Sequence, residues 1–113
     1  MSLAVKKADF FKQDYAKQFA WYVDEAGTEV AWRFQAVLDQ TLKKLARQLN
    51  LGRRRRFLNP RLHGLRSFQV GRPFNKVLVF YRAGDEVLDA VRLMHGARDL
   101  PRRLVEPPEG GAA

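Results

Sequence analysis

Cysteine is absent from this sequence of 113 residues, so neither a disulfide nor a thiolate metal site can form. Histidine occurs only at His63 and His95, which lie far apart in the sequence. The sequence also lacks a glycine-rich phosphate loop, a paired-carboxylate motif and a recognisable Ser/His/Asp arrangement. We therefore expect no metal and no cofactor.

Long hydrophobic runs are also missing. No apolar stretch approaches the roughly 20 residues that span a bilayer, and residues 1–7 contain lysines without the apolar segment of a secretory signal. We therefore expect a cytoplasmic protein with no membrane partner. The length and the 46% hydrophobic composition fit one domain, placed at residues 1–106, with a flexible tail at residues 107–113.

Acidic residues are missing from the middle of the chain. Between Gln40 and Gly84 there are twelve Lys and Arg residues and no Asp or Glu. Residues 1–50 carry eight basic and six acidic side chains, a net of +2, whereas residues 51–113 carry thirteen and six, a net of +7. This asymmetry favours a partner that presents phosphate or acidic groups, although residues 53–56 alone could be a solvated turn.

Apolar residues recur at helical spacing in two segments of the first half. Asp9 can cap the first helix, which ends before Gly27, and Thr28 can cap the second. The short link predicts an antiparallel helical hairpin with both apolar stripes in the core. These stripes are Phe11, Tyr15, Phe19 and Tyr22 in the first helix, and Val30, Phe34, Val37, Leu38, Thr41, Leu42, Leu45 and Leu49 in the second.

The hydrophobic period changes after Gly52. The basic run and Asn59-Pro60 predict a loop, and strand-like segments follow at residues 64–70, 75–82 and 86–94, joined by short turns. They predict a three-stranded antiparallel meander, to which residues 3–5 could add an edge strand. The expected fold is therefore a two-layer α+β domain, with the hairpin on one face of an antiparallel sheet and the other face partly open.

Several arginines could form a binding surface. Arg66, Arg82 and Arg92 lie in or at the end of predicted strands, and neighbouring strands can bring such side chains to one face. Converging guanidinium groups bind phosphate, whereas three unrelated solvent-exposed charges are the alternative. The expected target-binding or nucleic-acid-binding set is Arg53, Arg54, Arg55, Arg56, Arg61, Arg66, Arg82, Arg92 and Arg98.

His95 ends the last predicted strand. Its imidazole could act as a general base near neutral pH, or it could be a structural group hydrogen-bonded to the backbone. Asp99 could pair with Arg98 or cap a short turn from Leu100 to Leu104.

The order of these elements and several segments resembles the RelE/ParE superfamily of bacterial type II toxins. The segments are Trp21-Tyr22, Gly-Leu-Arg-Ser-Phe at residues 64–68, Lys-Val-Leu-Val-Phe-Tyr-Arg at residues 76–82, and Met-His-Gly-Ala-Arg-Asp-Leu at residues 94–100. The last of them is similar to the ParE, or plasmid-stabilisation, branch. The resemblance implies a toxin that is masked by a cognate antitoxin encoded beside it.

The superfamily resemblance implies two targets. RelE-like members cleave messenger RNA on the ribosome with basic residues and usually a late Tyr, but this sequence has no Tyr after Tyr81. In a nuclease of this kind, Arg66, Arg82, Arg92 and Arg98 would hold phosphate and His95 would move the proton. The missing Tyr favours a poison of DNA gyrase bound to DNA, which needs no chemistry by the toxin. A ribosome-dependent endoribonuclease and an inactive binding-only relative are the alternatives.

Overall fold

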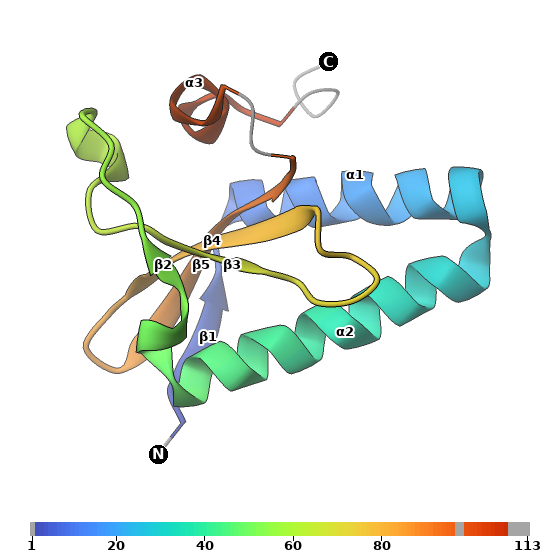
Figure 1. Cartoon of the computed structure of the whole chain (residues 1–113), viewed down its shortest axis with the longest axis horizontal. Coiled ribbons are helices and arrows are strands. Elements are labelled where there is room, and N and C mark those ends of the chain that lie inside the picture. Colours follow the sequence, from blue (N-terminus) through green and yellow to red (C-terminus); the bar gives the residue numbers. More distant parts are fainter. Residues whose placement is uncertain (1, 97–98, 109–113) are drawn as a thin grey trace.

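The computed structural model describes residues 2–96 and 99–108, in which a layer of two long helices packs on a sheet (Figure 1). The described residues form, in chain order, β1 (Ala4–Lys7), α1 (Asp9–Ala26), α2 (Thr28–Arg47), η1 (Leu49–Leu51), β2 (Arg53–Arg54), η2 (Pro60–Leu62), β3 (Arg66–Gln69), β4 (Val77–Ala83), β5 (Val87–His95) and α3 (Leu100–Val105). The predicted two-layer α+β fold with a helical hairpin is confirmed.

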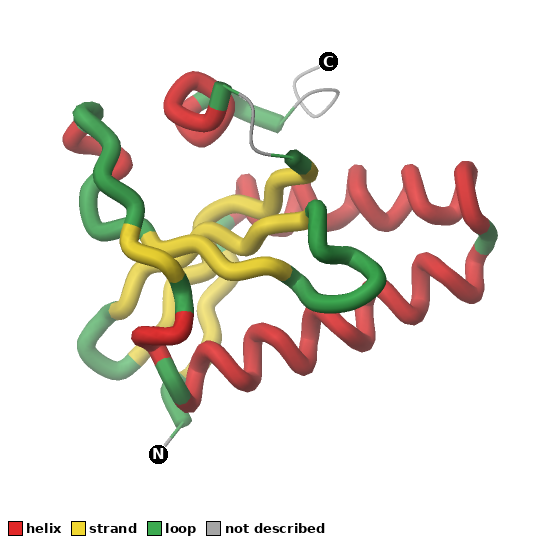
Figure 2. Tube along the Cα trace, viewed as in Figure 1, coloured by secondary structure: helices red, strands yellow, loops and turns green. Residues whose placement is uncertain are grey.

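The sheet contains the predicted meander and extends beyond it on both sides (Figure 2). Within the described residues it has five strands in the order β1-β5-β4-β3-β2, and the pairs from β2 to β5 are antiparallel. β1 departs from the predicted antiparallel sheet because it pairs parallel with β5. The helical hairpin lies between these two strands in the sequence, and such a long connection permits parallel pairing.

The predicted loop at residues 53–56 begins with a short strand instead. Arg53 pairs with Ser67 and Arg54 pairs with Arg66, which places β2 at the edge of the sheet. A run of like residues has no two-residue alternation, so the sequence gives no sign of a strand here. The ladder of hydrogen bonds to β3 determines this structure.

The helix caps differ from the prediction. Ala8 occupies the N-cap position of α1, and Asp9 is the first helical residue, where a carboxylate still favours the positive end of the helix dipole. Gly27 is the cap between the helices, with a φ of 95° that permits the reversal, so Thr28 already belongs to α2. α2 ends at Arg47, and Leu49 therefore lies in η1.

The main core lies between the hairpin and the facing side of the sheet. The stripe predicted for α2 is buried at Phe34, Leu38, Leu42 and Leu45, whereas Lys43 on the other side of the helix is exposed. The core joins these residues to apolar side chains of α1 and the central strands, namely Phe11, Tyr22, Val77, Val79, Tyr81, Leu88 and Ala90. The predicted amphipathic phase of α2 is confirmed.

The opposite face of the sheet is covered, whereas the sequence analysis predicted it to be partly open. η2, the residue before β3 and α3 cover it through Leu62, Leu65, Leu100 and Leu104, which form a second apolar cluster with Phe80 and Met94 of the sheet. This cover is invisible to a periodicity argument because each short segment contributes only one or two apolar side chains. Across the described ranges, no helix combines the length and apolar character needed to cross a bilayer.

Candidate functional site

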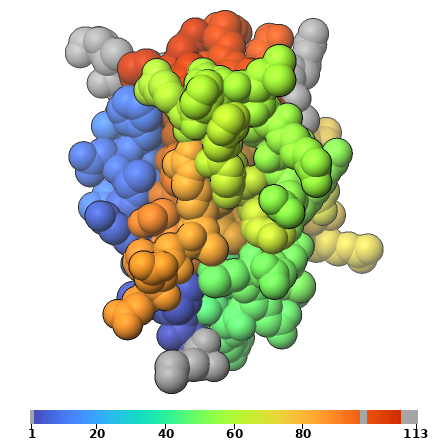
Figure 3. Space-filling model, turned by 90° about the vertical axis from the view of Figure 1, so that its left-hand side faces the viewer, coloured from blue at the N-terminus to red at the C-terminus, as the bar shows by residue number. Residues whose placement is uncertain are grey.

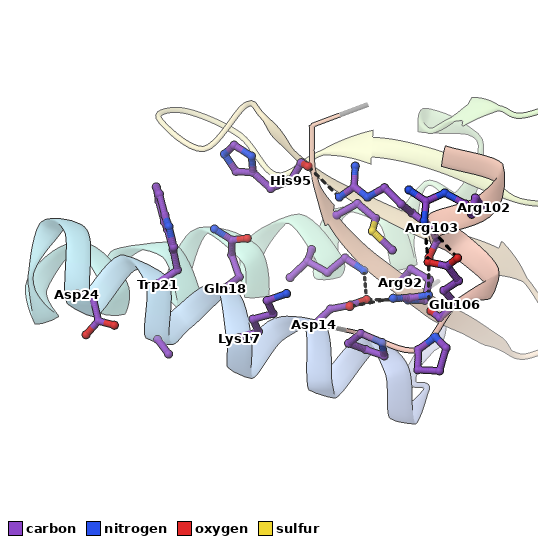
Figure 4. A pocket seen from close by; sticks show the side chains of 15 residues that line it. Asp14, Lys17, Gln18, Trp21, Asp24, Arg92, His95, Arg102, Arg103 and Glu106 are labelled. Atoms are coloured by element: carbon purple, nitrogen blue, oxygen red, sulfur yellow. Dashed lines mark hydrogen bonds and ion pairs between the residues drawn. The ribbon is translucent and has the colours of Figure 1, made fainter. Parts of the chain in front are cut away.

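A hollow of about 700 Å³ opens where the outer edge of β5 is not covered by β1 (Figure 4). β1 pairs only with Val87 to Ala90, so the second half of β5 borders the hollow instead of another strand. α1 forms one wall and α3 with Pro107 and Pro108 forms the other. The predicted tail begins with these two prolines, and its remainder, residues 109–113, lies outside the described residues.

The floor of this hollow is a buried ion pair. The Nε of Arg92 donates to Oδ2 of Asp14 at 2.8 Å, and Nη2 donates to Oδ1 at 3.0 Å. Asp14 Oδ2 also accepts the backbone N–H of Leu93, which satisfies one donor on the open edge of β5. A bidentate pair of this kind positions both charges firmly, so Arg92 is engaged inside the protein.

Arg92 also fixes the C-terminal segment. Its Nη1 lies within hydrogen-bonding distance of the carbonyl oxygens of Arg103, Leu104 and Glu106, which are groups at the end of α3. Carbonyls at a helix C-terminus lack partners within the helix, and a guanidinium can satisfy several of them. Arg92 therefore joins α1, β5 and α3.

His95 lies at the mouth of the same hollow. It is exposed, and its ring lies 6.0 Å from that of Trp21 between centroids. Its carbonyl oxygen accepts a hydrogen bond from Nη2 of Arg103 at 3.1 Å. Lys17 and Arg102 add basic groups, Asp24 and Glu106 add acidic ones, and Trp21 and Met94 add apolar surface, so the hollow combines charges of both signs with apolar walls.

A second feature is the segment of residues 52–63, called here the basic arm. It begins where the hydroxyl of Tyr81 accepts the N–H of Gly52 at 2.9 Å and donates to the carbonyl of Leu49 at 2.6 Å. Nη1 of Arg66 donates to the Gly52 carbonyl at 2.8 Å. A Cβ on Gly52 would collide with the ring of Tyr81, so this close approach requires glycine.

The middle of the basic arm is fixed by Arg55. Its Nε donates to Oγ of the buried Ser67 at 2.8 Å, and its guanidinium carbon lies 5.7 Å from the ring centroid of Phe80. Burial lowers the pKa of Arg55, and the positive charge of Arg53 lowers it further. Arg55 therefore acts as an anchor on the outer face of the sheet.

The end of the basic arm is fixed by Arg82. Its Nε donates to the carbonyl of His63 at 3.0 Å, and its Nη2 donates to the carbonyl of Arg61. Asn59 supports the same turn, because its side-chain oxygen accepts the N–H of Arg61 at 3.0 Å. The arm is thus fastened at its start, middle and end.

The remaining arginines of the arm point outward. Arg53, Arg54, Arg56 and Arg61 are exposed, and within the described residues no ion pair or side-chain hydrogen bond engages them. Leu58 lies among them and is 98% exposed. The predicted basic surface therefore exists on this arm, but only part of the predicted set contributes its charge to it.

The predicted strand arginines do not converge on one site. Arg66 lies opposite Tyr81 in the register, on the face that the helices cover, whereas Arg92 lies opposite Phe80 on the outer face. Arg82 follows Tyr81 along β4 and shares a shallow hollow of about 320 Å³ with Arg92. Strand pairing cannot be read from a single sequence, so the prediction of one shared face for all three is wrong.

The two predictions near the C-terminus have different outcomes. Arg98 lies outside the described residues. Asp99 adopts a φ of 54° before α3 and makes no side-chain cap, so the capping prediction is wrong; its carboxylate lies 3.7 Å from Nη2 of Arg102 at the surface. Among the described residues there is no group of three His, Cys, Asp or Glu side chains that could hold a metal ion.

The sequence matches the family model of the ParE toxin of the type II toxin-antitoxin system parDE over residues 5–100. The chain belongs to this ParE toxin family. A search of curated proteins found no match to the sequence.

Solved structures share the ParE-type fold. A chain of the chromosomal ParDE toxin-antitoxin system of P. aeruginosa matches with a TM-score of 0.68 and 19% identity, over 85% of this chain and 98% of that chain. A chain of the RelBE2 toxin-antitoxin complex of Mycobacterium tuberculosis matches with a TM-score of 0.58 and 19% identity, over 84% of this chain and 99% of that chain. Both likenesses concern the fold of the superfamily.

The tyrosines of this ParE-family chain are engaged in its core. Tyr15 donates to the side-chain oxygen of Gln35 at 3.0 Å, Tyr22 is buried, and Tyr81 holds the start of the basic arm. Burial raises the pKa of all three phenols. A group that transfers protons near neutral pH needs a pKa close to that pH, so these phenols are poorly suited to the task.

Asp14 is the residue that sequence reasoning missed. It follows Phe11 by three positions on α1, so it shares the helix face that contacts the sheet. A carboxylate on an apolar stripe, together with Arg92 in an apolar strand, is the available signal for a buried ion pair. The pairing itself depends on how the helix is placed on the sheet.

Proposed function

We propose that this ParE-type toxin inhibits DNA gyrase bound to DNA in the bacterial cytoplasm, and that a cognate antitoxin neutralises it. The observation that supports it best is the separation of His95 from the outward-facing arginines. His95 borders the hollow between α1 and α3, whereas the basic arm contains η2 and contributes Arg61 and Leu62 to the second hollow. A binding surface is available on the arm, but no tyrosine among the described residues lines the hollow that His95 borders.

Ribosomal nuclease activity would need a different arrangement. Phosphate-binding arginines must surround the scissile phosphate, with a proton-transfer group within hydrogen-bonding reach of the attacking hydroxyl. Arg92 is 2% exposed and paired with Asp14, and Arg66 lies on the other face of the sheet. These placements support a toxin that acts by binding.

One experiment separates the two targets. Purified toxin is incubated with gyrase and supercoiled plasmid in one tube, and with programmed ribosomes in another, for the native chain, His95→Ala and the control His63→Ala. We expect blocked supercoiling or trapped cleaved DNA with all three proteins and no messenger cleavage. Messenger cleavage that disappears in His95→Ala and persists in His63→Ala would assign the chain to the ribosome-dependent nucleases.

The hollow beside β5 is the proposed seat of the antitoxin. Lys17, Arg102 and Arg103 can pair with acidic groups of a partner, which would compete with Asp99 and Glu106 for Arg102, and Trp21 with Met94 suits the apolar side of an amphipathic segment. The similar solved structures come from toxin-antitoxin systems, which supports a partner of this kind. Binding by such a surface is expected to be tight and partly sensitive to salt.

Two exposed tryptophans provide a matched test. Trp21 borders the hollow and is 49% exposed, whereas Trp32 on α2 is 60% exposed and does not line it. We expect Trp21→Ala to weaken calorimetric binding of the antitoxin encoded beside the toxin by 10-fold or more, since buried aromatic anchors carry about 2 kcal/mol each, and Trp32→Ala to have little effect. No measurable association of the native proteins at moderate ionic strength would overturn the antitoxin proposal.

A further inference from the structure

The basic arm divides its arginines into two groups with different tasks. Arg55, together with Arg66 and Arg82 from the sheet, donates hydrogen bonds that fasten the arm. Arg53, Arg56 and Arg61 project from the fastened backbone toward solvent, whereas the exposed Arg54 lies opposite Arg66 and therefore on the other side of β2 from Arg53. A surface whose backbone is fixed loses less conformational freedom on binding, so the outward charges are prepared for a partner.

Leu58 gives the same arm an apolar tip. Its neighbour Phe57 turns inward and packs against the cluster of Leu62, Phe80 and Leu104, so the chain cannot rotate Leu58 into that cluster without removing Phe57. Among the large hydrophobic side chains of the described residues, Leu58 is the most exposed, at 98%. The arm therefore presents one aliphatic side chain within a group of guanidinium groups.

The charges of the arm itself are all positive, whereas Asp9 beside Arg61 and Arg82, and Asp99 and Glu106 beside Arg102, are carboxylates of neighbouring elements. The arm crosses the face of the molecule directly beside α3, which carries Arg102 and Arg103 (Figure 3). The sequence has no Asp or Glu between Gln40 and Gly84, so the arm, β3 and β4 contain no carboxylate side chain. The excess of positive charge within the arm attracts a polyanion over several ångströms.

We infer that the basic arm binds duplex DNA directly, with Arg53, Arg56 and Arg61 on backbone phosphates and Leu58 as an apolar tip in the groove. The inference deepens the proposed function and rests on it, because gyrase supplies the DNA in the cell. Arginines combined with an aliphatic wedge are typical of proteins that contact the minor groove of a duplex.

The composition of the arm favours a duplex over single-stranded RNA. Recognition of unpaired bases depends on aromatic rings on which the bases stack. Phe57, the one Phe of the arm, is turned into the apolar cluster, and the exposed tip is aliphatic. The exposed His63 is the one aromatic ring that the arm offers for stacking, which is few for a surface that binds several unpaired bases.

The test measures binding of the full-length toxin to DNA without gyrase. Fluorescence anisotropy with a labelled duplex of about 24 base pairs is recorded over a series of salt concentrations. Three phosphate contacts predict that log K falls against log salt with a slope of about −2.7. Arg56→Ala is expected to reduce the magnitude of the slope by about 1, whereas the control Arg33→Ala, an exposed arginine on α2, removes the same charge and leaves the slope unchanged.

Leu58→Ala tests the apolar tip separately. We expect it to weaken duplex binding several-fold with an unchanged salt slope, because no phosphate contact is lost. The control Leu51→Ala removes a side chain that is 38% exposed outside the arm and is expected to leave duplex binding unchanged. Since Leu58 and Arg56 are exposed, both variants are expected to unfold at the temperature of the native chain.

Three results would overturn the inference. They are the absence of duplex binding at 50 mM salt, an equal loss of affinity in Arg33→Ala and Arg56→Ala, and tighter binding of a single-stranded RNA of the same length than of the duplex. Gyrase inhibition is measured in a separate assay. Duplex binding with the expected pattern but without gyrase inhibition would overturn the proposed function alone. Gyrase inhibition without duplex binding would overturn the DNA contact alone.

Discussion

The two faces of the sheet are covered in different ways. On one face, α1 and α2 bury a continuous core in which ring pairs such as Tyr22–Phe34 and Phe34–Phe74 pack with centroids 4.9 and 5.2 Å apart. On the other, short segments supply a smaller apolar cluster, and arginine side chains bind their backbone carbonyls. The helical face is held by packing, and the outer face is held largely by guanidinium groups.

This difference agrees with where the proposed binding surfaces lie. A core formed by long amphipathic helices leaves little of its apolar surface for a partner. The outer segments are short and rich in charge, and they border both hollows and the basic arm. The surfaces that we propose as functional therefore lie largely beside the face that packing alone would hold poorly.

The largest effect should come from breaking the buried ion pair that supports the outer face. Asp14→Ala leaves Arg92 charged and buried without its partner, and a loss of about 3 to 5 kcal/mol in the free energy of unfolding is expected. Asp24→Ala, an exposed carboxylate on the same helix, is expected to change it by less than about 0.5 kcal/mol. Urea unfolding measures both; equal small losses would mean that Arg92 finds other partners.

A slightly smaller effect should come from a cavity on the helical face. Leu42 is 3% exposed in the main core, so Leu42→Ala is expected to cost about 2 to 5 kcal/mol. Lys43 is exposed on the other side of α2, and Lys43→Ala is expected to cost little. Thermal unfolding compares the two variants, and similar small shifts in Tm would contradict the packing of α2.

The helical face is also the part that the sequence predicts well. Spacings of three and four residues place Phe34, Leu38 and Leu42 on one side of α2, and this local pattern is enough to orient the helix. The alternating segments likewise predict β3 to β5. These elements are determined by residues near one another in the chain.

The outer face is predicted poorly because its interactions are distant in sequence. Arg92 and Asp14 are separated by 78 positions, and Arg55 reaches Ser67 only after the two-residue strand β2 has formed. A single sequence shows that these residues are basic, but not whether a guanidinium faces solvent or a backbone carbonyl. The predicted binding set therefore contained both anchoring and outward-facing arginines.

A moderate effect should appear where the two faces meet at Tyr81. Tyr81→Phe removes a hydroxyl that serves Gly52 and Leu49, and a loss of about 1 to 3 kcal/mol is expected because both backbone groups lose a partner. Chemical unfolding at pH 7 measures this loss. An unchanged free energy of unfolding would mean that water replaces the hydroxyl.

The same residue predicts a dependence of stability on alkaline pH. Burial raises the pKa of Tyr81 above its ordinary value of 10.0, so above pH 10 the unfolded chain loses this proton while the folded chain retains it. The free energy of unfolding should therefore fall as pH rises above 10, and it should not change through this group below pH 9. Tyr15 and Tyr22 act in the same direction, so Tyr81→Phe should reduce the slope without abolishing it.

The smallest effect on global stability should come from releasing one end of the basic arm. Arg82→Ala removes hydrogen bonds to the carbonyls of His63 and Arg61 that are exposed to solvent, so the free energy of unfolding should fall by only about 1 kcal/mol. The arm itself should open far more often, since local opening depends on its own few anchors. Limited trypsin digestion under native conditions, which cleaves after arginine, should therefore cut residues 53–61 several-fold faster in Arg82→Ala.

Arg72→Ala is the control, because this exposed arginine lies in the turn after β3, outside the arm. Equal rates of cutting in both variants would mean that the arm is held by its apolar contacts, and the contrast between a packed face and a guanidinium-bound face would then not extend to the arm.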